Sequence, residues 1–121
     1  EGSAEGGRMI RTIAIAACAA LPVAAWCLPC RAHDAPSGWS YSTYCCSGRD
    51  CAEARDGAVV PTRDGYAVVI TPGDHPMVTQ RTFKALVPYD SKSVLVSPDG
   101  LYHVCIVSGE VRCLYAPPMG Y

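Results

Sequence analysis

The sequence has none of the patterns typical of serine hydrolases, coiled coils or nucleic-acid-binding proteins. No nucleophile-elbow pattern surrounds a serine, and no internal repeat, heptad or long helical period is present. Charged residues make up only 17% of the chain, without a run of either sign, and the net charge is −1. Binding to nucleic-acid phosphates or to an anionic membrane surface is therefore disfavoured.

The N-terminal part of the chain has two sections that differ from the rest. Residues 1–8 are rich in glycine and glutamate and precede the first methionine, Met9. We interpret residues 1–8 as an upstream extension, with translation beginning at Met9; a short N-terminal extension of the protein itself is the alternative. With 121 residues in all, the chain has room for one domain at most.

Residues 9–32 follow the pattern of a secretory signal peptide. An arginine precedes an apolar run over 12–28, and small residues stand at −3 and −1 of a cleavage site after Ala32. The run contains Pro22 and covers about 17 residues, which is marginal for a hydrocarbon core of roughly 30 Å. We predict a signal helix that is removed, leaving a periplasmic or secreted domain without stable membrane insertion. An uncleaved anchor and lipidation at Cys18 are the alternatives.

The predicted mature domain, residues 33–121, has an odd number of cysteines. They are Cys45, Cys46, Cys51, Cys105 and Cys113. In an oxidising compartment, two disulfides and one free thiol are the simplest arrangement, and fifteen pairings satisfy it. Neighbouring Cys45 and Cys46 are poor partners because a bridge between them strains the peptide geometry.

The last two cysteines lie in a predicted hairpin formed by residues 101–107 and 110–116. A two-residue Ser-Gly turn pairs Cys105 with Arg112, whereas a three-residue turn places Cys105 opposite Cys113. We favour the first register because Ser-Gly suits a tight primed turn. Cys105 and Cys113 then each reach back to the other three cysteines. Each bridge of that kind closes a loop of more than fifty residues, which stabilises the fold by roughly 4 kcal/mol.

The remaining pattern predicts an all-β (β-rich) fold, a small antiparallel sheet of hairpins stapled by disulfides. Residues 33–42 are expected to form an extended arm that lays aromatic rings on the domain, and a short helical turn is expected through Arg55. Residues 116–121 contain two prolines and are expected to form a tail. Short strands are predicted at 58–60, 66–70, 83–87 and 93–96, in addition to the hairpin.

Three sequence blocks resemble a family of short, signal-peptide-bearing bacterial proteins. They are Cys-Cys-Ser-Gly-Arg-Asp-Cys at 45–51, Ser-Pro-Asp-Gly-Leu-Tyr-His-Val-Cys at 97–105, and Arg-Cys-Leu-Tyr-Ala-Pro-Pro-Met-Gly at 112–120. The resemblance implies an exported protein with the five cysteines as its framework. It implies no activity, ligand or catalytic residue.

Two kinds of chemistry are conceivable at the cysteines. His103 and Cys105 lie two apart on a strand and share a face, so together with His33 they are candidate ligands for copper or zinc. The mature domain has no CxxC pair, however, and disulfides are favoured over a metal. A leftover thiol beside disulfides could also undergo exchange, although the four residues between Cys46 and Cys51 match no redox motif.

The sequence therefore predicts a non-enzymatic binding or envelope-associated accessory domain without a cofactor. Its partner is expected to be a protein or a glycan, and a periplasmic metal-binding protein is the alternative. A set of aromatic residues could form a binding patch, but such residues more often cover a thin core. They are Trp39, Tyr41, Tyr44, Tyr115 and Tyr121.

Overall fold

The computed structural model describes residues 33–119, so the predicted extension (1–8) and signal peptide (9–32) lie outside the described residues. The described part contains seven strands and no helix, which confirms the predicted all-β fold. The strands are β1 (Cys51–Glu53), β2 (Val59–Pro61), β3 (Tyr66–Ile70), β4 (Phe83–Val87), β5 (Val94–Val96), β6 (His103–Val107) and β7 (Glu110–Ala116).

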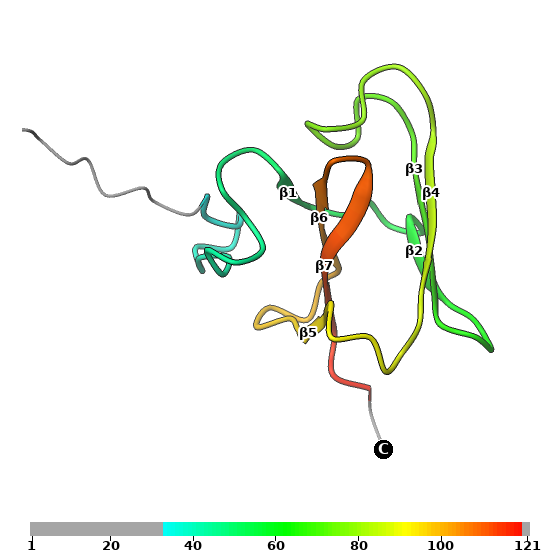
Figure 1. The fold of residues 1–121 in the computed structure, drawn as a ribbon. Coiled ribbons are helices and arrows are strands. Elements are labelled where there is room, and N and C mark those ends of the chain that lie inside the picture. Colours follow the sequence, from blue (N-terminus) through cyan, green and yellow to red (C-terminus); the bar gives the residue numbers. More distant parts are fainter. Residues whose placement is uncertain (1–32, 120–121) are drawn as a thin grey trace, which may run out of the picture.

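The strands form two sheets that lie side by side in Figure 1. One has four strands in the order β1-β6-β7-β5, and the other has three in the order β2-β3-β4. All neighbouring strands are antiparallel except β5 and β7, which pair in parallel. The Asp-Gly turn between β2 and β3 forms where it was predicted.

The main core lies between the two sheets. Val68 and Ile70 of β3 pack against Val104 and Ile106 of β6 and against Leu114 of β7, and all five are at most 2% exposed. Alternate residues of a strand face opposite sides of a sheet. The side chains between these core residues on β6 and β7 must therefore be covered by something else.

That cover is the arm, which we define as residues 33–50. It packs on the face of the four-stranded sheet opposite the three-stranded sheet, as the cyan segment in Figure 1 shows. Tyr41 and Tyr115 are buried there, and Trp39 lies edge-on to both rings at 4.8 and 5.0 Å. The expectation that the arm lays aromatic rings on the domain is thus confirmed, and β6 and β7 are covered on both faces.

The favoured register of the hairpin is wrong, although its turn is right. Ser108 and Gly109 form a two-residue turn with φ angles of 53° and 79°, and Val107 pairs with Glu110. A β-bulge then follows, so that Cys105 pairs with Cys113 instead of Arg112. The bulge has a clear physical benefit, because the extra residue lets Val111 face the core while Cys113 and Tyr115 face the arm.

A second difference lies after Cys51. The short helical turn expected through Arg55 does not form; residues 51–53 are instead strand β1, paired with β6. Pairing places Cys51 directly opposite Cys105, and this covalent partner outweighs the weak local preference of the segment.

Gly65 occupies a position that other residues cannot take without strain. Its φ is +147°, and a Cβ there would lie only 2.9 Å from the Cα of Pro88. We expect Gly65→Ala to lower the free energy of unfolding by about 2–3 kcal/mol, measured by urea denaturation. Gly57→Ala is the matched control, since Gly57 has a φ of +81° and open space around it. Equal losses in the two variants would contradict the proposed backbone contact.

Candidate functional site

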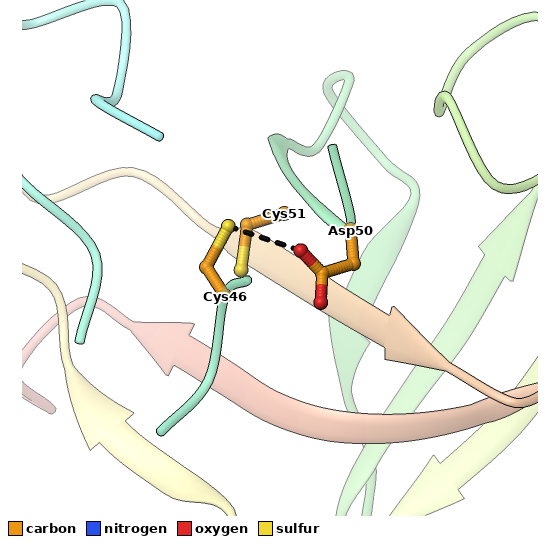
Figure 2. A group of neighbouring side chains, drawn as sticks. All are labelled: Cys46, Asp50 and Cys51. Carbon is orange, nitrogen blue, oxygen red and sulfur yellow. Dashed lines mark hydrogen bonds between the residues drawn. The ribbon is translucent and has the colours of Figure 1, made fainter. Parts of the chain in front are cut away.

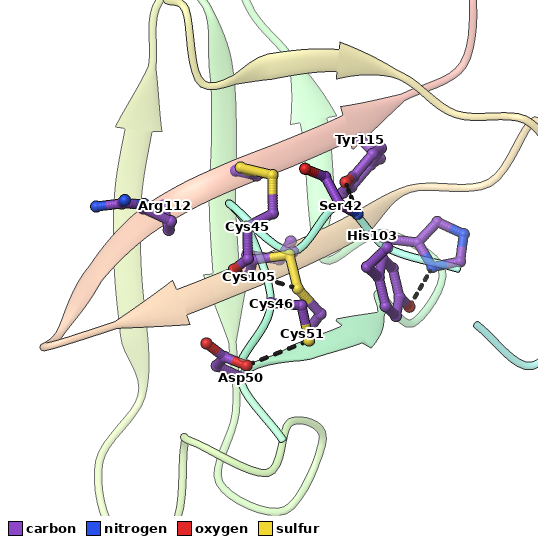
Figure 3. Close-up of a disulfide and its surroundings, with 12 residues drawn as sticks. Ser42, Cys45, Cys46, Asp50, Cys51, His103, Cys105, Arg112 and Tyr115 are labelled. Atoms are coloured by element: carbon purple, nitrogen blue, oxygen red, sulfur yellow. Dashed lines mark hydrogen bonds between the residues drawn. A yellow bond between two sulfur atoms is a disulfide. The ribbon is translucent and has the colours of Figure 1, made fainter. Parts of the chain in front are cut away.

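Two disulfides join the 45–51 segment to strands β6 and β7 of the four-stranded sheet. Disulfides link Cys45 to Cys113 and Cys51 to Cys105 across sequence separations of 68 and 54 residues. Both strands of the hairpin are therefore bonded back to the 45–51 segment, as predicted (Figure 3). The expected count of two bridges and one free thiol is also confirmed, and the free thiol is the buried Cys46.

Cys46 lies beside a carboxylate and a disulfide. Its S–H donates to Oδ1 of Asp50 at 3.2 Å, and the Sγ atoms of Cys46 and Cys51 lie within 4.8 Å of each other (Figure 2). Burial is the main reason why the pKa of the Cys46 thiol is raised, and the Asp50 charge raises it further. The thiol is therefore held in its protonated, weakly nucleophilic form.

Asp50 organises the loop that carries Cys46. Its carboxylate accepts hydrogen bonds from the backbone N–H groups of Ser47 and Gly48. Burial alone opposes the charged form, but these bonds and the bond from Cys46 outweigh it, and the pKa of Asp50 is lowered. An ionised Asp50 therefore sets the local turn that brings Cys46 and Cys51 together.

A second polar cluster fixes the other end of the arm. Asp99, in the turn before β6, accepts hydrogen bonds from Trp39 Nε1 at 2.8 Å and from Ser97 Oγ at 2.6 Å. Ser37 and the backbone N–H of Leu101 donate to it as well. Burial works against the charged carboxylate, yet these donors together hold the pKa of Asp99 far below its usual range.

His103 extends this cluster into the interior. Its Nε2 lies 3.0 Å from an Asp99 oxygen, and its Nδ1 lies 2.9 Å from the hydroxyl of Tyr41. Tyr41, His103 and Asp99 thus form a chain that resembles a catalytic triad in outline. The pKa of Tyr41 is raised, however, mainly by burial and further by the nearby charges of Cys46 and Asp99. Tyr41 is only 2% exposed, and a buried residue whose hydroxyl is hard to ionise suits a structural role.

We expect Asp99→Asn to lower the free energy of unfolding by about 2–4 kcal/mol, because an amide cannot accept all of these hydrogen bonds. Urea unfolding followed by Trp39 fluorescence measures the loss, since Trp39 is the only tryptophan in residues 33–121. Asp34→Asn is the control; its carboxylate accepts from Ser40 at an exposed position. A loss in Asp99→Asn no larger than that of the control would contradict the role assigned to Asp99.

His75 anchors the loop between β3 and β4, a structural role that the sequence did not indicate. It is 3% exposed; Nε2 donates to the backbone carbonyl of Val104 at 2.9 Å, while Nδ1 accepts from the N–H of Met77. This arrangement requires a neutral ring. Burial lowers the pKa of His75 more than the Val104 carbonyl and the Asp50 charge raise it.

The direction of this pKa shift predicts a pH dependence. In the unfolded chain a histidine has a pKa of about 6.5, so on acidification below that value the unfolded state binds a proton before the native state does. The contribution of His75 to stability is therefore complete above about pH 6.5 and is lost below it, by at most ~1.4 kcal/mol per pH unit. Unfolding free energies measured between pH 7 and 5 should fall less steeply in His75→Gln than in the wild type. In His33→Gln, where the side chain is exposed, the slope should change little; a steep slope that survives in His75→Gln would contradict the assignment.

A groove of about 630 Å³ lies between Tyr66 of β3 and the residues of β5 and of the C-terminal tail. Tyr66 and Tyr89 line one side, with ring centroids 4.8 Å apart. Val94, Val96 and Met119 contribute to the other side, together with two prolines, and no charged side chain among residues 33–119 lines the groove. Val96 and Met119 are 69% and 66% exposed.

The backbone of β5 adds polar groups beside this groove. The parallel ladder with β7 uses Ser93, whose carbonyl accepts from Leu114, and Ser97, whose N–H donates to Ala116. Because alternate residues direct their backbone groups to opposite sides, the N–H and C=O of Val96 point away from β7. β5 is an edge strand, so no other strand within residues 33–119 pairs with that side.

The predicted metal ligands are separated in the structure. His103 and Cys105 lie on one face of β6 as expected, but Cys105 is disulfide-bonded and both ring nitrogens of His103 have partners. His33 is exposed at the start of the arm. The closest set of metal-ligating side chains in the described region is Cys46, Asp50 and Cys51, and Cys51 is also in a disulfide.

No family model, curated protein or solved structure matches this chain. Across residues 33–119, none of the structure is a helix of the length and apolarity that a membrane crossing needs.

Proposed function

We propose that this protein is an exported, non-enzymatic binding domain whose groove between β5 and Tyr66 takes up an extended, apolar peptide segment of a partner protein. The groove is the observation that carries this proposal. Its volume, about 630 Å³, falls within the range of ligand sites in proteins.

Export is supported by the cysteines. Two disulfides that span 54 and 68 residues form and persist in oxidising compartments, and they are rare in the cytosol. The signal-peptide pattern over 9–32 and the resemblance to short exported bacterial proteins agree with this location. A domain of this size also has a small core, so long-range crosslinks contribute a large share of its stability.

An extended peptide suits the groove in two ways. The unpaired N–H and C=O of Val96 can accept one more strand at the edge of the sheet, and the apolar groove beside them can hold a side chain of that strand. Backbone hydrogen bonds then supply affinity and the groove supplies selectivity. Because no charged side chain lines the groove, the bound segment is expected to be neutral and apolar.

A glycan fits the same place less well. Sugar hydroxyls need several convergent polar partners, and the hydroxyl of Tyr89 already donates to the carbonyl of Thr62. Tyr66 is only 3% exposed and presents little of its ring face. Tyr41 of the arm and Tyr115 of β7 are also poor candidates, because both rings are buried.

A peptide selection tests the proposal. Short random peptides displayed on phage are selected against the oxidised protein, and the affinity of synthetic peptides is then measured by fluorescence anisotropy. We expect neutral, apolar sequences to be selected, and Val96→Lys to weaken their binding by at least about tenfold, which is about 1.4 kcal/mol. Bound peptide should also protect the Val96 amide from hydrogen exchange.

The matched control is Val69→Lys. Val69 is an exposed valine on a strand as well, 42% exposed, but it does not line the groove. Binding that is unaffected in Val69→Lys and weakened in Val96→Lys supports the proposal. Equal effects of both substitutions, or selection of a glycan from an array with no selection of peptides, would overturn it.

A further inference from the structure

The sulfur atom of Cys46 lies beside the disulfide between Cys51 and Cys105. Cys46 carries a free thiol, and Cys51 and Cys105 form the disulfide that joins β1 to β6. The Sγ atoms of Cys46 and Cys51 lie within 4.8 Å of each other. A thiol held this close to a disulfide needs no diffusional encounter before an exchange reaction.

We propose that Cys46, Cys51 and Cys105 form an internal disulfide-exchange unit, in which Cys46 can displace Cys105 from Cys51. The inference is independent of the proposed groove. It rests on the positions of the three sulfurs and on the loop over 46–51 that holds two of them together.

The exchange conserves atoms and electrons without an added oxidant. The Cys46 thiol loses its proton to water, and the thiolate attacks Sγ of Cys51. A Cys46–Cys51 bond forms while the Cys51–Cys105 bond breaks, and its electron pair leaves with Cys105, which then takes up a proton. Residues 33–119 contain two disulfides and one thiol both before and after the reaction.

The surroundings of Cys46 keep this reaction slow in the resting protein. The thiol is buried, and its proton is shared with the ionised Asp50 carboxylate. Tyr41, also on the arm, is a further titratable group that interacts with Cys46. Its hydroxyl is bonded to His103 and does not take the proton. Removing the proton from Cys46 places two negative charges side by side, so thiolate formation is the barrier that controls the exchange.

The exchange changes which strands are covalently joined. The Cys51–Cys105 bond spans 54 residues and fixes β1 to the centre of the sheet. A Cys46–Cys51 bond closes only the short loop over 46–51 and leaves β1 held by three residue pairs with β6. The Cys45–Cys113 bond is not involved, so the arm stays attached to β7 in both forms.

The position of the free thiol reports the exchange directly. Purified, oxidised protein is incubated at mildly acidic, neutral and alkaline pH, quenched with acid, unfolded, and labelled with N-ethylmaleimide at mildly acidic pH. Mass spectrometry of peptic peptides then identifies the labelled cysteine. We expect the label on Cys46 at mildly acidic pH, and a fraction on Cys105 that grows faster as the pH rises, with a first-order rate that is independent of protein concentration.

Two variants separate this mechanism from general scrambling. Cys46→Ser removes the attacking thiol, and no label should then appear on Cys105. Asp50→Asn removes the neighbouring charge but keeps a side-chain oxygen that can accept from the N–H groups of Ser47 and Gly48, so the turn that holds Cys46 beside Cys51 is retained. The label should then move to Cys105 at a lower pH than in the wild type, and this variant also keeps the test valid if Cys46→Ser does not fold. Label that stays on Cys46 at alkaline pH, that appears on Cys113, or that moves at a rate proportional to protein concentration would overturn the proposal.

Discussion

Attachment of the arm to β6 and β7 is the constraint on which the rest of the structure depends. These two strands carry buried side chains on both faces, but only one face is covered by another sheet. The other face is covered by the arm, which contains no strand. It therefore cannot be held in place by a ladder of backbone hydrogen bonds. The Cys45–Cys113 disulfide and the Asp99 cluster hold it in place instead, near opposite ends of the arm. The sulfur atoms are thus part of the core as well as its crosslinks.

Much of the fold can be read from the sequence because its strands are short and separated by strong turn signals. Tyr66–Ile70 and Phe83–Val87 form where alternation and β-branched residues predict them, and the Ser108-Gly109 turn forms as expected. The register of the hairpin beyond that turn was not predictable from local pattern. Val111 and Cys113 are two apart and would share a face in a regular strand. They face opposite layers here, and only knowledge of both layers would have indicated the bulge at Arg112.

The candidate sites were less predictable for the same reason. The cysteines indicated a link between 45–51 and the hairpin, but not which of them stays free. Cys51 is chosen as the partner of Cys105 because β1 pairs with β6, and no sequence signal marked residues 51–53 as a strand. Asp99 lies in a turn, and two of its hydrogen-bond donors, Ser37 and Trp39, are about sixty positions away in the sequence. The groove is formed by Tyr66 and Val96, which lie on different sheets.

The order of strands places the two proposed properties at opposite edges of one sheet. The order is β1-β6-β7-β5, with the exchangeable Cys51–Cys105 bond at the β1 edge and the groove at the β5 edge. Both bridges join the 45–51 segment to β6 or β7, and neither includes β5. β5 is held by a parallel ladder of only three residue pairs, so it can adjust to a bound strand without disturbing a covalent bond. Conversely, exchange at Cys51 would remove the covalent link between β1 and β6. The Cys45–Cys113 bond would still hold the arm on β7, and β7 is the strand that pairs with β5. Peptide binding and disulfide exchange are therefore expected to be energetically independent, because the doubly covered pair β6–β7 lies between them.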